Sequence, residues 1–443
     1  MRSFVRGRSL HLFLIALAGF AAASGTRLFG HSSDTHFVYL AQSLLKGRAS
    51  LAVPPPNDND WAKVETLELA DGRKIRGAFL VGETDLFRTT RGERVRAPKA
   101  EIKQRSAEWY VSFPPLPAIL MMPLVAISGP LTNDVVFTLV WSACNVPLLF
   151  WLLRRLSRLG YAARSEPDDL WLTGLFAFGS VYFYSSVIGQ VWYTAHVVAT
   201  TFAIGFCGAS LEARHPALAG LCLGLATAAR TPLGFLAPFF LFEAWRCRRG
   251  ELLRVLARFA LPAGAIGAAL GAFNYARFDR IAEFGHTYLT VRWAGRIQKY
   301  GLFNYNFLPR NLAAMLVLTP KLMSYRPYVQ VSWHGMSVFL TTPVLALLAW
   351  PRVRGPLHGA LWWTVLLVAG QTLFYQNDGW VQFGYRFIND YLVLLVALLA
   401  VGGRPIGRGT KALIVAGVLV NAFGAVTFGR YWQFYYDGFF PAE

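Results

Sequence analysis

The segment LHLFLIALAGFAAASGTRLFGHSSD (residues 10–34) joins a long apolar run to a carboxylate, Asp34. The run over residues 10–28 is long enough to cross the roughly 30 Å of hydrocarbon in a bilayer as a helix. A carboxylate placed just past such a helix, at the boundary between lipid and water, is costly unless it is solvated or has a function. The segment therefore predicts a membrane-spanning helix that leads into a polar site.

Apolar runs of similar length recur along most of the 443 residues. The chain is 55% hydrophobic and only 15% charged, whereas soluble domains carry about 25% charged residues. We expect an all-α polytopic membrane protein with about eleven transmembrane helices. The predicted spans lie near residues 10–28, 134–153, 170–188, 193–211, 216–229, 232–245, 257–275, 335–350, 358–375, 387–401 and 411–429.

The positions of the arginines predict the orientation. Arg2, Arg6 and Arg8 precede the first span, so the positive-inside rule places the N-terminus in the cytoplasm. Alternation from there leaves the short cytoplasmic loops basic, and these loops contain Arg154, Arg155, Arg158, Arg214, Arg246, Arg248, Arg249, Arg254, Arg352, Arg354, Arg404, Arg408 and Lys411. The C-terminus and the large polar loops then face outward, in a multi-pass protein of the plasma (inner) membrane.

This distribution also bears on the net charge of +19. Many of the arginines fall in short loops between apolar runs, and no basic helix is interleaved with exposed aromatic residues. A nucleic-acid partner is therefore not expected.

The chain divides into three parts. Residues 1–61 hold the first span and the acidic motif. Residues 62–106 alternate apolar and polar side chains between Gly-containing turns, which predicts a small β-rich insert in the first outer loop. Residues 107–443 form the transmembrane helical domain, with outer loops at 276–334 and 376–386.

Two short helices are expected at the outer surface. The apolar residues that follow Asp34 have helical spacing, so a helix that lies flat on the membrane should begin there. Asp34 is either the N-terminal cap of this helix or a catalytic residue, and the two roles are compatible. Residues 112–130 are apolar but short, which favours a re-entrant or interfacial helix.

Several charged residues near the predicted outer helix ends are candidates for binding. Arg230 stands beside the helix break at Thr231-Pro232, where a lone arginine should line a polar cavity or extend from a helix end to water. An anion such as a phosphate is its natural partner. The segment NYARFDRIAEFGHTYL (274–289) adds Arg277 and His286.

The segment GWVQFGYRFINDYL (379–392) adds Tyr385, Arg386 and Asp390. Aromatic faces suit sugar rings and arginine suits phosphate. The alternative for both segments is an interfacial belt of aromatic residues with internal ion pairs. Asp58 and Asp60 are weak candidates for a divalent metal site, because carboxylates that flank a turn are more often simply solvated.

The chain resembles the GT-C superfamily of polytopic glycosyltransferases, which includes protein O-mannosyltransferases and lipid A aminoarabinose transferases. The resemblance is one of pattern and order along most of the chain. The segments that carry it are SDTHFVYLAQSLLKGR (33–48), EWYVSFPPLPAILMMPL (108–124), LCLGLATAARTPLGFLAPFF (221–240), NYARFDRIAEFG (274–285) and FGYRFINDYLVLL (383–395).

The resemblance implies an inverting transfer of a sugar from a polyprenyl-phosphate donor to an extracytoplasmic acceptor. Asp34 takes the position of the family's general base. Many members carry a second acidic residue beside it, but Thr35 and His36 follow here. Either Asp34 acts alone or Asp58 or Asp60 supplies the partner. The rival functions are an O-antigen ligase or polymerase and a polytopic lipid or sugar transporter.

Overall fold

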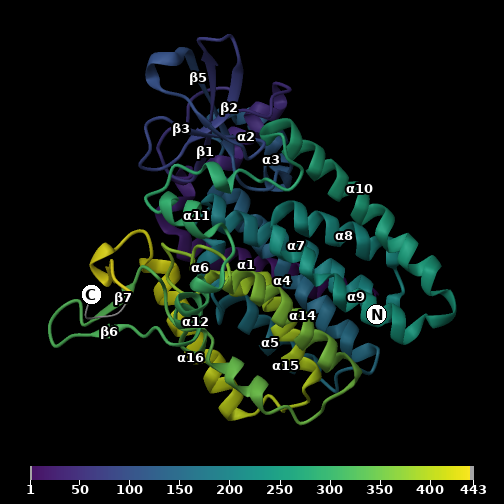
Figure 1. The fold of residues 1–443 in the computed structure, drawn as a ribbon. Coiled ribbons are helices and arrows are strands. Elements are labelled where there is room, and N and C mark those ends of the chain that lie inside the picture. Colours follow the sequence, from purple (N-terminus) through teal and green to yellow (C-terminus); the bar gives the residue numbers. More distant parts are fainter. Residues whose placement is uncertain (1, 440–443) are drawn as a thin grey trace.

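The computed structural model describes residues 2–439 (Figure 1). Five helices in this range are long and apolar enough to cross a membrane. They are α1 (Arg2–Ser24), which continues into the 3₁₀ turn η1 (Gly25–Phe29), α4 (Asp134–Arg158), α7 (Val191–Ser210), α10 (Leu252–Phe278) and α16 (Arg408–Thr427). The last four residues, part of the C-terminus predicted to face outward, lie outside the described residues.

Helices also occupy the other predicted spans, but they are shorter or interrupted. They are α5 (Glu166–Phe178), α6 (Tyr182–Ser186), α8 (Pro216–Ala229), η5 (Thr231–Leu236), α9 (Ala237–Cys247), α13 (Val338–Thr341), η9 (Pro343–Ala349), α14 (Pro356–Leu373), η10 (Arg386–Asp390) and α15 (Leu392–Val401). Helices thus lie at all the predicted spans, whereas the number of membrane crossings stays a prediction.

Helix α7 lies at the centre of the bundle. In its most apolar stretch 83% of the residues are buried, against 22% in α1, 17% in α10 and 28% in α16. The three outer helices therefore present apolar side chains outward, as a helix must where its surroundings are lipid. Helix α4 packs between α1 and α7, and α8 packs between α7 and α10.

Small residues let α8 and α10 approach closely. A Cβ atom added at Gly220 would lie 1.9 Å from the backbone oxygen of Phe259, and one added at Gly224 would lie 2.7 Å from the Ile266 side chain. Glycines four residues apart on one helix face are a common device for close packing between membrane helices.

A five-stranded antiparallel sheet stands at one end of the helices, beside α2 (His36–Leu45), α3 (Leu116–Ser128) and the C-terminal end of α10 (Figure 1). Its strands, in the spatial order β4-β3-β2-β1-β5, are β1 (Trp61–Leu69), β2 (Lys74–Phe79), β3 (Leu86–Thr89), β4 (Arg94–Arg96) and β5 (Ile102–Val111). Trp61 pairs with Val111, so the sheet brings the residue before β1, Asp60, next to Ser112, which follows β5.

The remaining loop segments form short elements on the same side. They are η7 (His286–Tyr288), α11 (Ala294–Tyr300), η8 (Tyr305–Phe307), α12 (Leu308–Leu316), β6 (Lys321–Leu322), β7 (Val329–Ser332), η11 (Trp432–Phe434) and β8 (Tyr435–Tyr436). Strand β7 pairs with β8 in parallel, which ties the chain near the C-terminus to the loop before α13.

Replacing Gly220 with alanine should lower the stability of the helix bundle, because the new methyl group meets the α10 backbone. Overpacking of this kind costs about 1–3 kcal/mol. The matched control is Gly264→Ala in α10, where no atom lies within 4 Å of the added Cβ. Thermal unfolding in detergent should show a lower melting temperature for Gly220→Ala only. Equal melting temperatures would contradict the close contact of the two helices.

Candidate active site

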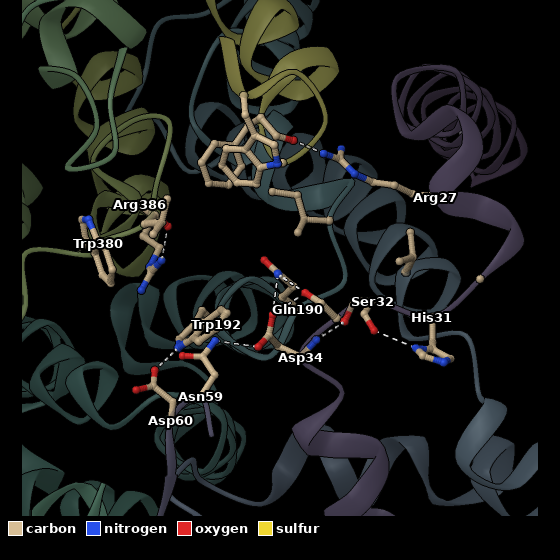
Figure 2. A pocket seen from close by; sticks show the side chains of 18 of the residues that line it. Arg27, His31, Ser32, Asp34, Asn59, Asp60, Gln190, Trp192, Trp380 and Arg386 are labelled. Atoms are coloured by element: carbon tan, nitrogen blue, oxygen red, sulfur yellow. Dashed lines mark hydrogen bonds between the residues drawn. The ribbon is translucent and has the colours of Figure 1, made fainter. Parts of the chain in front are cut away.

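A cavity of about 570 Å³ opens where several helix ends meet. Its wall includes residues from the end of η1, the start of α4, the segment that leads into α7, and the segment after α16. Asp34, Asn59, Asp60, Trp192 and Arg386 all line it (Figure 2). Residues far apart in sequence therefore face one space on the side where the sheet stands.

Asp34 is buried at the cavity wall and held by three donors. Asn59 Nδ2 donates to Oδ1 at 2.8 Å, while Gln190 Nε2 and Ser33 Oγ each donate to Oδ2 at 2.6 Å. These amide and hydroxyl donors fix the position of the carboxylate without a cationic partner. Asp34 is thus a fixed anion in contact with the cavity (Figure 2).

The loop before Asp34 is anchored to the first turn of α4. The Asp134 carboxylate accepts the Ser32 backbone N–H at 2.7 Å and the Ser32 hydroxyl at 2.6 Å. Two charge-assisted hydrogen bonds fix this turn. Asp134 therefore sets the position of Asp34 from outside the cavity.

Asp60 lines the same cavity as Asp34, and Trp192 Nε1 donates to its Oδ2 at 2.8 Å (Figure 2). Burial raises the pKa of Asp60 above its ordinary value, and the negative charge of Asp34 acts in the same direction, whereas Trp192 and Arg386 oppose it. The position of Asp60 depends on His36. The His36 ring stacks on Trp61 with centroids 3.7 Å apart, and its Nε2 lies 2.9 Å from the backbone oxygen of Asn59.

Arg386 is 4% exposed and has no carboxylate within ion-pair distance among residues 2–439. One of its Nη atoms donates to the Val381 oxygen at 3.1 Å. Its guanidinium also lies over the rings of Trp192, Tyr193 and Phe387 at 5.5–5.7 Å. Figure 2 shows the guanidinium between Trp380 and Trp192, facing the cavity. A buried cation without a counterion is costly, which makes it a ready site for an anion.

A second cavity, of about 280 Å³, adjoins the first. The two share Asp60, Trp192 and Arg386 as a common wall. The second cavity also contains Arg230 and His286. The remaining lining residues are Ser112, Phe113, Pro114, Thr231, Pro232, Phe235, Ala282, Glu283, Phe284, Leu289, Leu302, Phe303, Gln371, Thr372, Tyr375, Gln376, Asn377 and Phe387.

A family model described as glycosyltransferase family 87 matches residues 110–374, more than half of the chain. The chain belongs to glycosyltransferase family 87. Together with the apolar helices, this makes it a membrane glycosyltransferase, as the sequence predicted.

One solved structure is similar to this glycosyltransferase, the apo form of the Archaeoglobus fulgidus oligosaccharyltransferase. The similarity covers 97% of this chain and 56% of that chain, with 11% sequence identity and a TM-score of 0.49. This chain therefore matches little more than half the length of the archaeal enzyme. No curated protein matches the sequence.

The cavities of the family 87 chain bring together five of the residues singled out from the sequence, namely Asp34, Asp60, Arg230, His286 and Arg386. Arg230 is paired, since its guanidinium contacts both carboxylate oxygens of Asp390 at 3.1 and 2.6 Å. Asp390 lines neither cavity and also lies 2.9 Å from His196 Nδ1. It acts on the site by holding Arg230.

Arg277, Tyr385 and Asp58 also line neither cavity. The Arg277 guanidinium is fully buried and donates to the Val111 oxygen at 2.6 Å and to Asn274 Oδ1 at 2.7 Å. It therefore ties the end of the sheet to α10. Tyr385 is fully buried, and the Asp58 side chain is exposed.

Of the two metal candidates, Asp60 lines the cavity and the exposed Asp58 does not. Asp34 Oδ1 accepts one hydrogen bond, from Asn59, and keeps a free lone pair for a further contact. No group of three or more His, Cys, Asp and Glu side chains that could hold a metal ion occurs in the described part of the chain. No step derived below uses a metal.

Sequence reasoning did not single out Asn59, Gln190, Trp192 or Asp134 as site residues. Gln190 is the last residue before α7 and Asp134 the first of α4, and both stand at the predicted outer end of a span. A polar residue at an outer helix end is the signal that these two share with Asp34. Asn59 and Trp192 gave no comparable signal.

The two arginines should respond differently to replacement by methionine. Arg277→Met leaves two buried acceptors unpaired, which costs about 1–3 kcal/mol, and its melting temperature should fall clearly. Arg386→Met removes a buried charge that has no carboxylate at ion-pair distance, so its melting temperature should fall less than that of Arg277→Met. Thermal unfolding of the two purified variants measures this. A larger loss for Arg386→Met would show that its charge is structural.

Stability should fall in mild acid because two histidines, His36 and His286, have lowered pKa values. Burial, with the charges of Arg230 and Arg277, lowers the pKa of His286 to about 4, and burial lowers that of His36 to about 4. An unfolded histidine titrates near pH 6.5. Between pH 4 and pH 6.5 the unfolded chain binds more protons than the folded chain. The contribution of the two histidines to the free energy of unfolding is therefore complete above about pH 6.5 and is lost as the pH falls towards 4.

Melting temperatures measured from pH 7 to pH 4 test this expectation. His286→Gln removes one of the two groups, so its melting temperature should fall less steeply over the same range. An identical slope for the wild type and the variant would show that His286 is not held in its neutral form.

Proposed function

We propose that this glycosyltransferase transfers a sugar from a polyprenyl-phosphate donor to an extracytoplasmic acceptor with inversion at the anomeric carbon. One observation carries the proposal. Arg386 belongs to the wall shared by the two cavities, has no carboxylate partner among the described residues, and lines the same cavity as the fixed anion Asp34. A cation for the leaving phosphate and a base for the nucleophile thus border one space.

The two cavities suit the two halves of such a donor. The second cavity, with Phe235, Leu289 and Phe303 among its apolar residues, receives the first prenyl units. The phosphate then lies at Arg386, with Arg230 beside it. The sugar extends past the shared wall into the first cavity, towards Asp34. Arginine is well suited to the phosphate because its planar fork of N–H donors matches phosphate oxygens.

The reaction needs one proton acceptor and one charge stabiliser. Asp34 takes the proton of the acceptor hydroxyl as its oxygen forms a bond to the anomeric carbon. The bond between that carbon and the phosphate oxygen breaks on the opposite face, and the electron pair leaves with the polyprenyl phosphate. Arg386 and Arg230 stabilise the negative charge that develops there.

Asp60 is the second carboxylate of the site. Its side chain lines both cavities, whereas the exposed Asp58 lines neither. We assign Asp60 to orienting a sugar hydroxyl at the junction, with Trp192 fixing its carboxylate. A carboxyl group in this position can accept a hydrogen bond from the sugar without competing with Asp34 for the acceptor proton.

The direction of transfer follows from the helix ends. The cavity lies at the start of α4 and α7 and at the end of α16. The arginines follow the other ends, with Arg154, Arg155 and Arg158 at the end of α4, Arg214 after α7 and Arg408 at the start of α16. The positive-inside rule places the arginines in the cytoplasm, so the site opens on the outer face of the plasma membrane.

Asp34→Asn should lower transfer by about 10²–10⁴-fold, the usual contribution of a positioned general base. The measurement is transfer from a panel of radiolabelled polyprenyl-phosphate sugars in proteoliposomes, with a membrane extract of the producing cells as the acceptor source. The matched control is Asp58→Asn, which makes the same change at an exposed position of the next loop and should retain activity.

Each outcome tests a different part of the proposal. Full activity of Asp34→Asn would remove Asp34 as the base and would make Asp60 the next candidate. Absence of transfer from every donor by the wild type would contradict the donor class. Equal loss in both variants would show that the effect comes from the loops and not from the Asp34 carboxylate.

A further inference from the structure

A third cavity, of about 360 Å³, lies beside the Asp34 cavity and shares Trp293 and Trp380 with it. Its other lining residues are Arg292, Arg296, Arg310, His334, Asn377, Asp378 and Asp437. They come from α11 and the residues just before it, from α12, from the loop at 376–386 and from the chain after β7 and β8. The proposed transfer uses none of these side chains, so this groove needs an explanation of its own.

The carboxylates of the groove are already engaged. Asp378 is buried, and its Oδ2 accepts hydrogen bonds from Arg310 Nε at 2.9 Å and His334 Nδ1 at 2.8 Å. Asp437 Oδ1 accepts the Trp380 indole N–H at 3.3 Å. Arg310 is therefore neutralised within the protein, and Asp437 is occupied in positioning an aromatic ring.

Arg292 and Arg296 have no carboxylate within ion-pair distance in residues 2–439. Arg292 is exposed, and its guanidinium lies 4.9 Å from the centre of the Trp380 ring. Arg296 donates through Nη2 to the Gln376 oxygen at 2.7 Å, while its Nε is buried without a partner. The groove thus carries two guanidinium groups without an ion-pair partner, one just before α11 and one in it, and this donor set matches carboxylate or phosphate groups.

The two tryptophans connect this positive groove to the site of transfer. The rings of Trp293 and Trp380 meet edge to face, with centroids 5.6 Å apart and an angle of 89° between the planes. An indole ring offers an apolar face and a polar N–H, which suits the C–H face of a pyranose ring. A chain of sugars that starts near Asp34 would cross these rings and reach Arg292.

We propose that the groove binds the acceptor, and that the acceptor is an acidic saccharide carrying carboxylate or phosphate groups. Its terminal hydroxyl lies at Asp34, the next sugar lies against Trp293 and Trp380, and its acidic group contacts Arg292 and Arg296. The inference rests on the proposed function and names its acceptor class. A neutral glycan would leave both arginines unused, and a lipid head group would leave the tryptophan pair unused.

Binding tests the inference without any transfer step. The protein is full-length Asp34→Asn in nanodiscs of zwitterionic lipid, and the probes are fluorescent trigalacturonate, a trisaccharide with a terminal sugar phosphate, and neutral maltotriose. We expect an acidic probe to bind at least about tenfold more tightly than maltotriose, the effect of one charge-assisted hydrogen bond. Comparison of the two acidic probes distinguishes carboxylate from phosphate.

Charge reversal locates the site. Arg292→Glu, at an exposed position, should weaken binding of the acidic probe by at least about tenfold and leave maltotriose unchanged. The matched control is Arg94→Glu, the same change at an exposed position on strand β4, which should bind as before. The affinity for the acidic probe should also fall as salt concentration rises.

Three results would overturn the proposal. They are equal affinity for acidic and neutral probes, unchanged binding in Arg292→Glu, and Arg292-dependent binding of a short-chain phosphatidylglycerol in place of the saccharides. Failure of the proposed function looks different. In that case no polyprenyl-phosphate donor supports transfer, yet acidic saccharides still bind at Arg292.

Discussion

A positive charge held away from water must find an acceptor, and three arginines beside the cavities meet this requirement in different ways. Arg277 satisfies it with a backbone carbonyl and an amide, and so becomes a structural link between the sheet and α10. Arg230 satisfies it with both oxygens of Asp390. Arg386 has one carbonyl and three ring faces but no carboxylate among the described residues. The free-energy cost of burying the Arg386 charge is offset when an anion binds.

The sequence predicts local features of the fold better than contacts between distant segments of the chain. The positions of the spans follow from the length of the apolar runs, and a helix lies at each predicted position. The break at Thr231-Pro232 was predicted, whereas the interruption between α5 and α6 was not, because it depends on packing against helices from elsewhere in the chain. For the same reason Arg277 could not be distinguished from Arg386. Arg277 lies at the end of an apolar helix and Arg386 stands before one, and each has aromatic neighbours in sequence. The contacts that distinguish them involve distant segments of the chain.

Asp60 shows why the second carboxylate could not be chosen from the sequence. The motif around residues 58–60 offers two aspartates with the same local pattern. The pairing of Trp61 with Val111 and the stacking of His36 on Trp61 decide between them. These contacts turn Asp60 towards the cavity and leave Asp58 in solvent. An alternation of apolar and polar residues predicts strands, but it does not predict which end of a strand meets a helix.

The shared wall of the two main cavities links the geometry to the choice of substrates. A lipid-linked sugar has an apolar end, a charged linkage and a polar end, and it must place the linkage where the two environments meet. Asp60, Trp192 and Arg386 stand at that boundary, and only Arg386 among them is cationic. On the proposed function, the linkage that breaks lies at this wall, where Asp34 on one side and Arg386 on the other can act on it together. Residues on either side of this wall can then vary to fit a different lipid or acceptor without changing the geometry of the transfer itself.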